Sequence, residues 1–599
     1  MKGLATRMFG IDPRSLALFR VGLASLLLID LLLRSFNIAE FYTDGGIFPR
    51  AQFLEVVRPW HFSIHAMSGS LGWQIILFVA AALAAFFLLV GYRTKWASFF
   101  SFLFLASIIN RNSIVIQAGD NLLVALTFWA MFLPLGATRS VDAALLPRLK
   151  EEPNQTNPLP SFLTLGTVAI LLQVLFVYIF TAIFKSGPHW RSEFDAVYWA
   201  LNIEHYSTSL GLWMTQFPGL LKVFTVMTLV VETGAPYLIL CPFLWPHLRT
   251  VGLVALFGMH VSFLFFMHLG LFPWIDFVAL MLFLPSAFWE KLKAIFPPKP
   301  LTIYYDKDCG FCLRMALLIR EFFCAHDTQI ETCQSDSEIY AVMEKANSWV
   351  VKDDQDHLFL RWDGVVRAMR MHALGRWPAK VFSFSFINKA GHGIYKRIAN
   401  NRHRVGPFFA RWLPYRQITI KTHWLVQCVA GAFLVTVFCY NFFGLKKFRH
   451  LRPKFITPLM HSVRLDQRWG MFSPKPLVVS FVPQIVGTLR NEKKVNLYPL
   501  TEIDEDWQPS NHFYSYYENY RWRKWYERVY LKGHKQASFS MGSALCRNWN
   551  RNPKSKQEEL ARVEIFFVVH KTNDEGNPKE KLRKRKWHHW CFEEFKDKK

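Results

Sequence analysis

Cysteine is scarce in this chain, and acidic residues are few relative to basic ones. Only nine of the 599 residues are cysteine and they are widely scattered, so the sequence does not predict a framework of disulfides. The 44 acidic residues are outnumbered by 70 basic ones, which gives a net charge of +26. Because the chain lacks a recognisable nucleic-acid-binding module, anionic lipid headgroups are favoured over nucleic acid as the partner of this charge.

The N-terminus also lacks the cleavage site of a signal peptide. Its first apolar run continues past signal length and ends at Arg34, so we interpret it as a membrane span. No internal repeat is evident, which gives no indication of a solenoid or an array.

Long apolar runs, by contrast, recur along the chain. Hydrophobic residues make up 52% of it, with 56 Phe and 22 Trp, which is typical of a polytopic membrane protein. Hydropathy predicts nine spans, at Leu16–Phe36, Leu71–Tyr92, Trp96–Asn110, Asn121–Gly136, Phe162–Phe184, Leu220–Trp245, Val251–Leu269, Phe272–Trp289 and Trp424–Leu445.

The fold class predicted is a polytopic α-helical membrane bundle with an inserted α/β domain and a C-terminal mixed, partly β soluble domain. Residues 1–296 hold about eight spans, 297–421 have the composition of a soluble α/β domain, 422–445 form the ninth span, and 446–599 are polar, aromatic and basic. Within the last part we expect strands at Leu477–Pro483 and Val563–His570.

The distribution of lysine and arginine predicts the orientation. Basic residues gather on one side of an eight-span bundle: before the first span, between spans two and three, after span four and after span eight. The N-terminus and the inserted domain are therefore expected in the cytoplasm, with the C-terminal domain outside. Basic residues flank the ninth span on both sides, so they do not decide the last assignment.

Cys309 and Cys312 form the one cysteine pair with a motif spacing. Leu301–Asp306 has the composition of a strand and Leu313–Phe323 has helical periodicity, which places both thiols at a strand-to-helix turn. A helix N-terminus stabilises a thiolate, so Cys309 is the expected attacking thiol and Cys312 the resolving one. Half a zinc site is the alternative, but Cys324 and Cys333 lack the spacing of a second ligand pair.

The dithiol segment Asp306–Cys312, followed by Gly393–Arg402, resembles the DCC family of thiol-disulfide oxidoreductases. This resemblance covers about residues 300–404 and implies a thioredoxin-like sheet flanked by helices. The chain departs from thioredoxin in one respect, because no proline precedes the expected strand Trp349–Lys352, where thioredoxins place a cis-proline beside the dithiol.

Charged and titratable residues inside the predicted spans mark functional or paired positions. Asp30 and Arg34 are spaced to pair along a helix. Further polar residues occupy later spans, and their number predicts a polar cavity; they are Asp120, Glu232, His260, His268 and Asp276. Lys185 ends the fifth span, at the outer end under the assigned orientation. There it either snorkels to the interface or serves chemistry.

Several motifs of the membrane half resemble the HTTM family, the membrane domain shared with vitamin K-dependent γ-glutamyl carboxylase. They are Tyr42–Gly46, Gly91–Arg93, Gly119–Asn121, Ser140–Asp142, Lys185–Trp190, and His260 with Gly270–Phe272. After the last span, Arg464–Pro474 resembles the corresponding segment of bacterial HTTM proteins.

The carboxylase resemblance implies a role for Lys185, whose counterpart deprotonates vitamin K hydroquinone. A desolvated lysine suits such a base physically. His189 and Trp190 follow Lys185 in the same motif and, with Asp120, Glu232 and His260, are the candidate substrate or cavity residues. Ala137 stands where the carboxylase has a histidine, three residues before Ser140–Asp142, which puts glutamate carboxylation itself in doubt.

The C-terminal part interleaves aromatic and basic residues at Tyr520–Tyr526 and Lys581–Cys591. Beside a membrane, this pattern favours contact with lipid headgroups over nucleic acid. His588, His589 and Cys591 lack a fourth ligand at a suitable spacing, so no metal site is predicted.

Together these observations predict a multi-pass redox enzyme, consistent with a bacterial inner membrane. Its dithiol would exchange electrons with a thiol or thioredoxin-type partner, and its bundle would bind a quinone or another lipid near Lys185. The sequence establishes no cofactor, and a quinone or hydroquinone is the one candidate. Two alternatives remain open: a catalytically silent scaffold or transporter that carries an active dithiol domain, and a glutamyl carboxylase of the vitamin K-dependent type.

Overall fold

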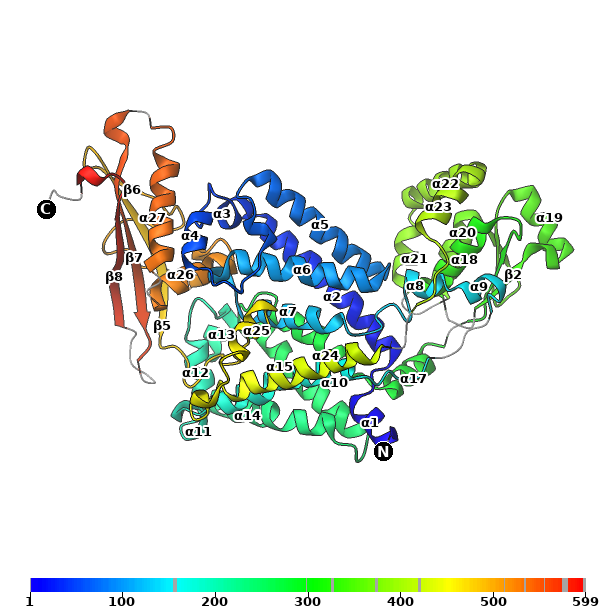
Figure 1. Ribbon diagram of the computed structural model, residues 1–599, viewed down its shortest axis with the longest axis horizontal. Coiled ribbons are helices and arrows are strands. Elements are labelled where there is room, and N and C mark those ends of the chain that lie inside the picture. The colour runs from blue at the N-terminus through cyan, green and yellow to red at the C-terminus, as the bar shows by residue number, and fades with distance from the viewer. Residues whose placement is uncertain are drawn as a thin grey trace.

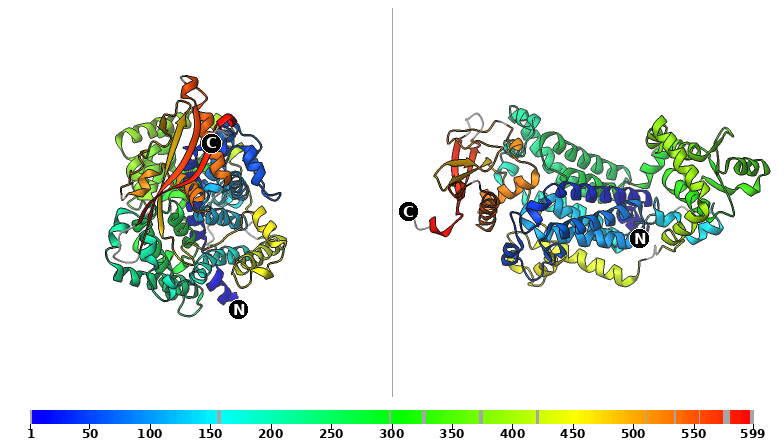
Figure 2. Two further views of the ribbon diagram at one scale, coloured as in Figure 1. Left: turned by 90° about the vertical axis from the view of Figure 1, so that its left-hand side faces the viewer. Right: turned by 90° about the horizontal axis from the view of Figure 1, so that it is seen from above.

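The structure is a computed structural model of the chain. It describes residues 2–154, 159–297, 299–324, 328–371, 375–418, 422–510, 512–532, 535–553, 555–573 and 580–595. The predicted domain boundary at Lys421 lies outside these residues. A helical bundle forms the middle of the molecule, with the inserted domain at one end and the C-terminal sheet at the other (Figure 1). Figure 2 shows the same order from above.

Apolar helices form the bundle, and six of those in the described residues are long and apolar enough to cross a membrane. They are α2 (Pro13–Ser35), α5 (Leu71–Val90), α10 (Leu165–Phe184), α14 (Pro218–Leu240), α15 (His247–Phe266) and α24 (Trp424–Phe442). A seventh would be α16 (Phe272–Met281) with α17 (Ser286–Ile295), which meet at a bend of 91°. Each coincides with a predicted span.

The two remaining predicted spans are the helices α6 (Thr94–Arg111) and α7 (Ala118–Ala130). Helix α7 has 13 residues and is buried along nearly its whole length. A helix rises 1.5 Å per residue, so α7 is about 20 Å long, short of the roughly 30 Å hydrocarbon core. Its assignment, and that of α6, as complete spans stays a prediction.

Helix α5 illustrates why these helices belong in lipid. One face packs on the bundle through residues such as Leu77, Ala81 and Leu88, while Ile76, Val79 and Leu83 point outward and are more than half exposed. A helix whose outward face is apolar as well as its packed face would be unfavourable in water. Such a helix is stable against acyl chains, which is the environment that the sequence predicts.

The inserted domain has the thioredoxin-like arrangement that the resemblance implies. Its sheet has the order β2-β1-β3-β4, with β1 parallel to β2 and the other pairs antiparallel. The strands are β1 (Thr302–Tyr305), β2 (Gln329–Thr332), β3 (Val350–Lys352) and β4 (Leu358–Leu360). The helices are α18 (Gly310–Phe323), α19 (Ser337–Ala346), α20 (Arg361–Arg370), α21 (Arg376–Phe382), α22 (Ser385–Asn400) and α23 (Arg402–Trp412).

The C-terminal domain is built on an antiparallel sheet of order β6-β5-β7-β8. Its strands are β5 (Val479–Leu489), β6 (Lys494–Asn496), β7 (Leu560–Lys571) and β8 (Glu580–Trp590), and its long helices are α26 (Tyr520–Lys532) and α27 (Lys535–Trp549). The strand predicted at Val563–His570 is confirmed as part of β7, and the one predicted at Leu477–Pro483 overlaps β5 from Val479 to Pro483. Lys581–Trp590 is the basic edge strand β8, where charge discourages pairing with another sheet.

Helix α26 corrects the prediction that Tyr520–Tyr526 contacts lipid headgroups. The helix is wedged between the sheet and the bundle, and Arg521, Trp525 and Tyr526 are all buried. Trp525 lies between Phe41 and Phe48 of the bundle, with ring centroids 6.3 and 6.2 Å away. The interleaving of aromatic and basic residues therefore serves an internal junction: the rings fill it and the guanidinium groups pair with buried carboxylates.

A disulfide joins Cys546 in α27 to Cys591 after β8, with the two Cα atoms 5.4 Å apart. The scattered cysteines gave no indication of this bond, because the partners are 45 positions apart and share no motif. The sequence did not predict a framework of disulfides, and one bond outside the dithiol does not amount to a framework. The bond ties the helix that covers the sheet to its edge strand.

Candidate functional site

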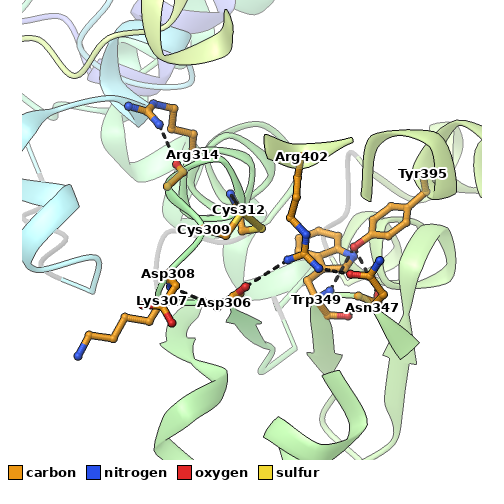
Figure 3. Close-up of a disulfide and its surroundings, with 12 residues drawn as sticks. Asp306, Lys307, Asp308, Cys309, Cys312, Arg314, Asn347, Trp349, Tyr395 and Arg402 are labelled. Atoms are coloured by element: carbon orange, nitrogen blue, oxygen red, sulfur yellow. Dashed lines mark hydrogen bonds and ion pairs between the residues drawn. A yellow bond between two sulfur atoms is a disulfide. The ribbon is translucent and has the colours of Figure 1, made fainter. Parts of the chain in front are cut away.

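The predicted dithiol lies at the N-terminus of α18, immediately after β1. Cys309 is the residue that caps the helix, and its Sγ accepts a hydrogen bond from the backbone N–H of Cys312 at 3.3 Å. The two cysteines are joined as a disulfide, with their Cα atoms 5.3 Å apart, and both are partly buried (Figure 3). A sulfur at this position receives the free N–H groups and the positive end of the helix dipole, which stabilise a thiolate after reduction.

The loop before Cys309 is fixed by Asp306. One carboxylate oxygen of Asp306 accepts hydrogen bonds from the backbone of Asp308 (3.2 Å) and from Gln334 (2.9 Å). The other lies 3.1 Å from a guanidinium nitrogen of Arg402, which also binds Asn347 (Figure 3). The two sequence motifs of this domain therefore meet: the end of the second one holds the loop that presents the thiols.

The second motif also contacts the start of β3 through Tyr395. Its hydroxyl accepts a hydrogen bond from the backbone N–H of Trp349 at 3.1 Å and from the hydroxyl of Ser348 at 3.4 Å. Ser348 and Trp349 stand where thioredoxins carry their cis-proline segment. In this chain a tyrosine from α22 restrains that segment, a role that the sequence pattern alone did not reveal.

The other two cysteines of this domain are poor nucleophiles. Burial raises the pKa of the Cys324 thiol to about 12, and burial likewise raises the pKa of Cys333 to about 12. Both thiols stay protonated at neutral pH, and a protonated thiol neither attacks a disulfide nor binds a metal well. The arrangement supports Cys309 and Cys312 as the redox pair.

The inserted domain contacts the bundle through the segment that begins with the Ser140–Asp142 motif. Arg139 donates to the backbone carbonyls of Glu321 and Cys324, each at 2.8 Å, at the end of α18. The Asp142 carboxylate caps the start of α6 through the backbone N–H groups of Arg93 and Thr94, both at 2.9 Å. The motif thus holds the start of α6, and the preceding Arg139 joins the bundle to the inserted domain.

Lys185 lies in a closed contact at the end of α10. Its ammonium donates to both carboxylate oxygens of Glu232, at 2.6 and 2.7 Å, and lies 4.3 Å from the centroid of the Trp190 ring. All three side chains are buried. Three of the predicted site residues therefore meet, and Lys185 does not snorkel into solvent. Both oxygens of Glu232 occupy the Lys185 nitrogen, so Lys185 can contact another partner only after Glu232 is displaced.

The segment resembling bacterial HTTM proteins covers this contact. The Trp190 indole N–H donates to the carbonyl of Phe472 at 2.9 Å, and the Gly187 N–H donates to the carbonyl of Pro474 at 3.1 Å. Nearby, Gln173 of α10 and Gln467 exchange amide hydrogen bonds at 2.6 and 2.9 Å. Gln467 belongs to the Arg464–Pro474 motif, but Gln173 belongs to none, so the sequence gave no indication that the two glutamines pair.

His189 points to a different group of side chains. Its Nδ1 lies 2.7 Å from Glu193 and 2.8 Å from Asp195, and Asp195 also accepts the Trp199 indole N–H at 2.8 Å. The ligand atoms of His189, Glu193 and Asp195 lie within 4.8 Å of one another, close enough to share a metal ion. Exposed acidic groups commonly gather without one, so the prediction of no metal site remains untested.

Asp120 belongs to a buried network that joins the bundle to the C-terminal domain. Arg34 binds Asp30 at 2.7 Å, as the spacing predicted, and also Asp120 at 2.5 Å. Arg521 of α26 completes the network, 2.5 Å from Asp30 and 3.2 Å from Asp120. Two carboxylates and two guanidinium groups balance in charge, which stabilises a buried cluster. Sequence reasoning missed Arg521, because it lies in another domain.

His260 forms a third cluster, with Tyr178 and Asp276. Its Nε2 lies 3.0 Å from the Tyr178 hydroxyl, which lies 3.4 Å from Asp276. Tyr178 lies on α10 seven residues before Lys185, the residue that follows the helix, so the two are about 10 Å apart along its axis. In the described residues these candidates separate into distinct clusters whose members pair with one another, and a polar cavity in the bundle stays a prediction.

The dithiol and Lys185 lie at opposite ends of the bundle. Helix α18 is in the inserted domain at one end, whereas α11 (Pro188–Arg191), which follows Lys185, is at the other end beneath the C-terminal sheet (Figure 1). Direct contact between the two sites is excluded in this arrangement.

Two protein-family models match the chain. Residues 9–289 match the HTTM domain, and residues 303–407 match the DCC1-like thiol-disulfide oxidoreductase. The segment Arg464–Pro474 lies outside both matches. Comparisons with curated proteins and with solved structures returned no match.

Proposed function

Because the chain carries an HTTM membrane domain followed by a DCC1-like thiol-disulfide oxidoreductase domain, we propose that it is a membrane-bound dithiol reductant. The observation that carries the proposal is the position of Cys309 as the cap of α18, with Cys312 one turn later. The expected partners are a disulfide substrate and a thioredoxin-type thiol that restores the dithiol.

The reaction follows from this geometry. The Cys309 thiolate attacks a disulfide of the partner, forms a mixed disulfide and releases one partner thiolate. The Cys312 thiolate then attacks Cys309, forms the Cys309–Cys312 disulfide and releases the second partner thiolate. Two electrons pass to the partner, and a second dithiol returns them by the reverse exchange.

Trapping tests this assignment in the full chain, reduced and held in nanodiscs, with dithiobis(nitrobenzoate) as the disulfide. Cys312→Ser should retain a stable adduct on Cys309, whereas Cys309→Ser should lose the rapid reaction. Cys333→Ser is the matched control, because it removes a buried thiol of the same domain. A rapid phase that survives in Cys309→Ser would contradict the mechanism.

We propose that the dithiol domain lies in the cytoplasm, as the basic residues predict, and that the C-terminal domain lies outside, across the ninth span. The presence of these two domains at opposite ends supports it, as does the Cys546–Cys591 disulfide, since stable disulfides are typical of oxidising compartments. In cells treated with a reductant, an impermeant maleimide should label Cys309 only after the cells are lysed. Labelling in intact bacterial cells would reverse the assignment.

For the bundle, the buried Lys185–Glu232 pair favours a second function, the binding of a quinone or another lipid substrate. A hydroquinone hydroxyl would replace Glu232 as the partner of Lys185; when Glu232 leaves with the ammonium proton, the neutral amine accepts the hydroxyl proton. Binding of a reconstituted quinol, measured by equilibrium dialysis into nanodiscs, should be lost in Lys185→Met.

Two alternatives make different predictions for Lys185. If the bundle is a silent scaffold or transporter, Lys185→Ala keeps every activity that Cys309→Ser loses. If the protein is a glutamyl carboxylase despite Ala137, glutamate-rich peptides incorporate labelled bicarbonate with a quinol present. Absence of labelling with several quinols would exclude the second alternative under those conditions.

A further inference from the structure

Helices α21 to α23 of the inserted domain leave a basic and aromatic face without acidic residues. From Gly364 to Leu465 the chain contains no Asp or Glu. The exposed basic residues of these helices are Arg376, Lys380, Lys389, Lys396, Arg397, Arg404 and Arg411. The exposed aromatic residues are Trp377, Phe384, Phe386, Phe408 and Trp412, all more than half exposed.

Helix α23 shows most clearly that this face is organised. Arg404, Pro407, Phe408, Arg411 and Trp412 are all exposed, and their spacing of three and four residues places them on one side of the helix. The opposite side packs on the redox site: the Phe409 ring lies 5.3 Å from the ring of Phe311, between the two cysteines. The helix is thus amphipathic, with one apolar and basic face unoccupied in the described chain.

The end of α23 lies at the end of a candidate span. The hydroxyl of Tyr92, two residues after α5, donates to the carbonyl of Trp412 at 2.7 Å. Trp96, near the start of α6, is 62% exposed, and Trp424, 64% exposed, begins α24 twelve residues after Trp412. Exposed tryptophans at helix ends are typical of the membrane–water interface. The contact with Tyr92 therefore places Trp412 at the depth of that interface.

The orientation of the inserted domain agrees with this position. Helices α21 to α23 lie on the side of the domain nearer the bundle, and α19 lies farthest from it, in both views (Figures 1 and 2). The α21–α23 face consequently extends beside the ends of the spans, over the place that lipid headgroups occupy.

We propose that the exposed face of α23, with the neighbouring basic residues of α21 and α22, binds the anionic lipid surface around the bundle. Phe408 and Trp412 enter the headgroup layer, and Arg404 and Arg411 bind lipid phosphates. The dithiol then sits one helix diameter, about 10 Å, above the headgroups, facing partners that are themselves at the membrane. This lipid contact does not depend on redox activity.

Hydrogen exchange of the full chain tests the contact. Nanodiscs of phosphatidylcholine alone are compared with nanodiscs containing 30% phosphatidylglycerol. We expect the amides of α23 to exchange about fivefold more slowly with the anionic lipid, and 0.5 M salt to reduce the difference, because salt screens surface charge. The peptide covering α19 is the internal control and should exchange equally in both.

Two variants separate lipid binding from folding. Arg404→Glu with Arg411→Glu should abolish the lipid dependence, while Lys345→Glu, an exposed charge reversal on α19, should leave it unchanged. The rate of dithiol reaction in detergent verifies that the variants are folded. Equal exchange of α23 in the two nanodiscs would overturn the proposal. Protection that depends on protein concentration and not on lipid charge would overturn it in favour of a second copy.

Discussion

The Arg402 guanidinium lies 3.1 Å from the Asp306 carboxylate, although the two residues are 96 positions apart. This ion pair joins the first residue of α23 to the loop that ends at Cys309. The same helix packs its Phe409 ring on Phe311. The position of the thiols therefore depends on a helix that the motif around the cysteines does not contain.

Arg402→Met should slow the reaction of the reduced dithiol with dithiobis(nitrobenzoate). The pair is partly exposed, and such pairs contribute roughly 0.2–1 kcal/mol, so a decrease of about 1.5- to 5-fold is expected. Stopped-flow absorbance measures the rate. Arg397→Met removes a like charge from the exposed side of α22 and should react as the unaltered chain does. Equal rates in both variants would show that Asp306 needs no partner.

Cys324 and Cys333 should resist alkylation in the folded protein. Both have a pKa of about 12 because of burial, so their labelling by iodoacetamide should be slow at pH 8 and rise about tenfold per pH unit. Unfolded thiols ionise near pH 8.5, so the free energy of unfolding should fall as pH rises from about 8.5 towards 12. Peptide mass spectrometry and urea titrations measure these effects. Labelling of Cys324 or Cys333 as fast as that of Cys309 would contradict their burial.

Breaking the Lys185–Glu232 pair should cost more than removing it. Lys185→Met or Glu232→Leu alone leaves one buried charge unpaired and should destabilise the protein by about 3–5 kcal/mol. The double variant should recover most of that loss, because an apolar pair can fill the same space. Thermal unfolding in one detergent gives the comparison. A double variant as unstable as the sum of the single ones would indicate independent roles.

Loss of the Cys546–Cys591 disulfide should destabilise the C-terminal domain. The bond closes a loop of 45 positions, for which the chain-entropy relation gives about 4 kcal/mol. Cys546→Ala with Cys591→Ala should therefore lower the thermal midpoint, as monitored by exchange of the β7 amides. Cys428→Ala, an exposed free cysteine on α24, is the control. An unchanged midpoint would mean that α27 and β8 hold together without the bond.

Acid should weaken the contact between α26 and the loop that holds His205. This loop joins α12 (Ala196–Leu201) to α13 (Ser209–Met214). Burial lowers the pKa of His205 to about 3, with a smaller effect from Arg523. Glu527 and Lys524 of α26 are the other charged groups that act on it.

The fold favours the neutral form of His205. Its contribution to the free energy of unfolding is fully present above the unfolded pKa of about 6.5 and is lost as the pH falls from there towards the folded pKa of about 3. At pH 5 the loss should be about 2 kcal/mol. Thermal unfolding at pH 7 and 5 should show an acid-induced loss that is smaller in His205→Phe by this amount, because other buried histidines such as His65 keep their own contributions. Exposed His450→Gln is the control. Equal acid sensitivity in all three would assign the effect elsewhere.

Features set by local pattern were predictable from the sequence. The apolar runs identified the long helices because membrane length is a fixed requirement, and the Cys309 motif located the strand-to-helix turn. The i, i+4 spacing of Asp30 and Arg34 predicted their ion pair because a helix determines that geometry.

Contacts between distant segments were not predictable in the same way. Arg521 has the local sequence of a surface helix, and only its contact with Asp30 explains why it is buried. Likewise, nothing near Cys546 indicates a bond to Cys591. Tyr520–Tyr526 was misinterpreted because aromatic and basic residues serve a lipid interface and a buried charged junction equally well. The composition is the same in both cases, and only the partner of these residues, a lipid surface or buried carboxylates, distinguishes the two.

The contact between Arg521 and Asp30 has a consequence for biogenesis. Asp30, Arg34 and Asp120 are translated early, and as a group they contain one more acid than base. The compensating Arg521 is translated 491 positions after Asp30, when every candidate span already precedes it. This buried cluster therefore becomes neutral only when the last part of the chain has been made and has folded back against the membrane half. A chain truncated before α26 would keep a buried carboxylate without its counterion, which makes completeness of synthesis a condition for a stable bundle.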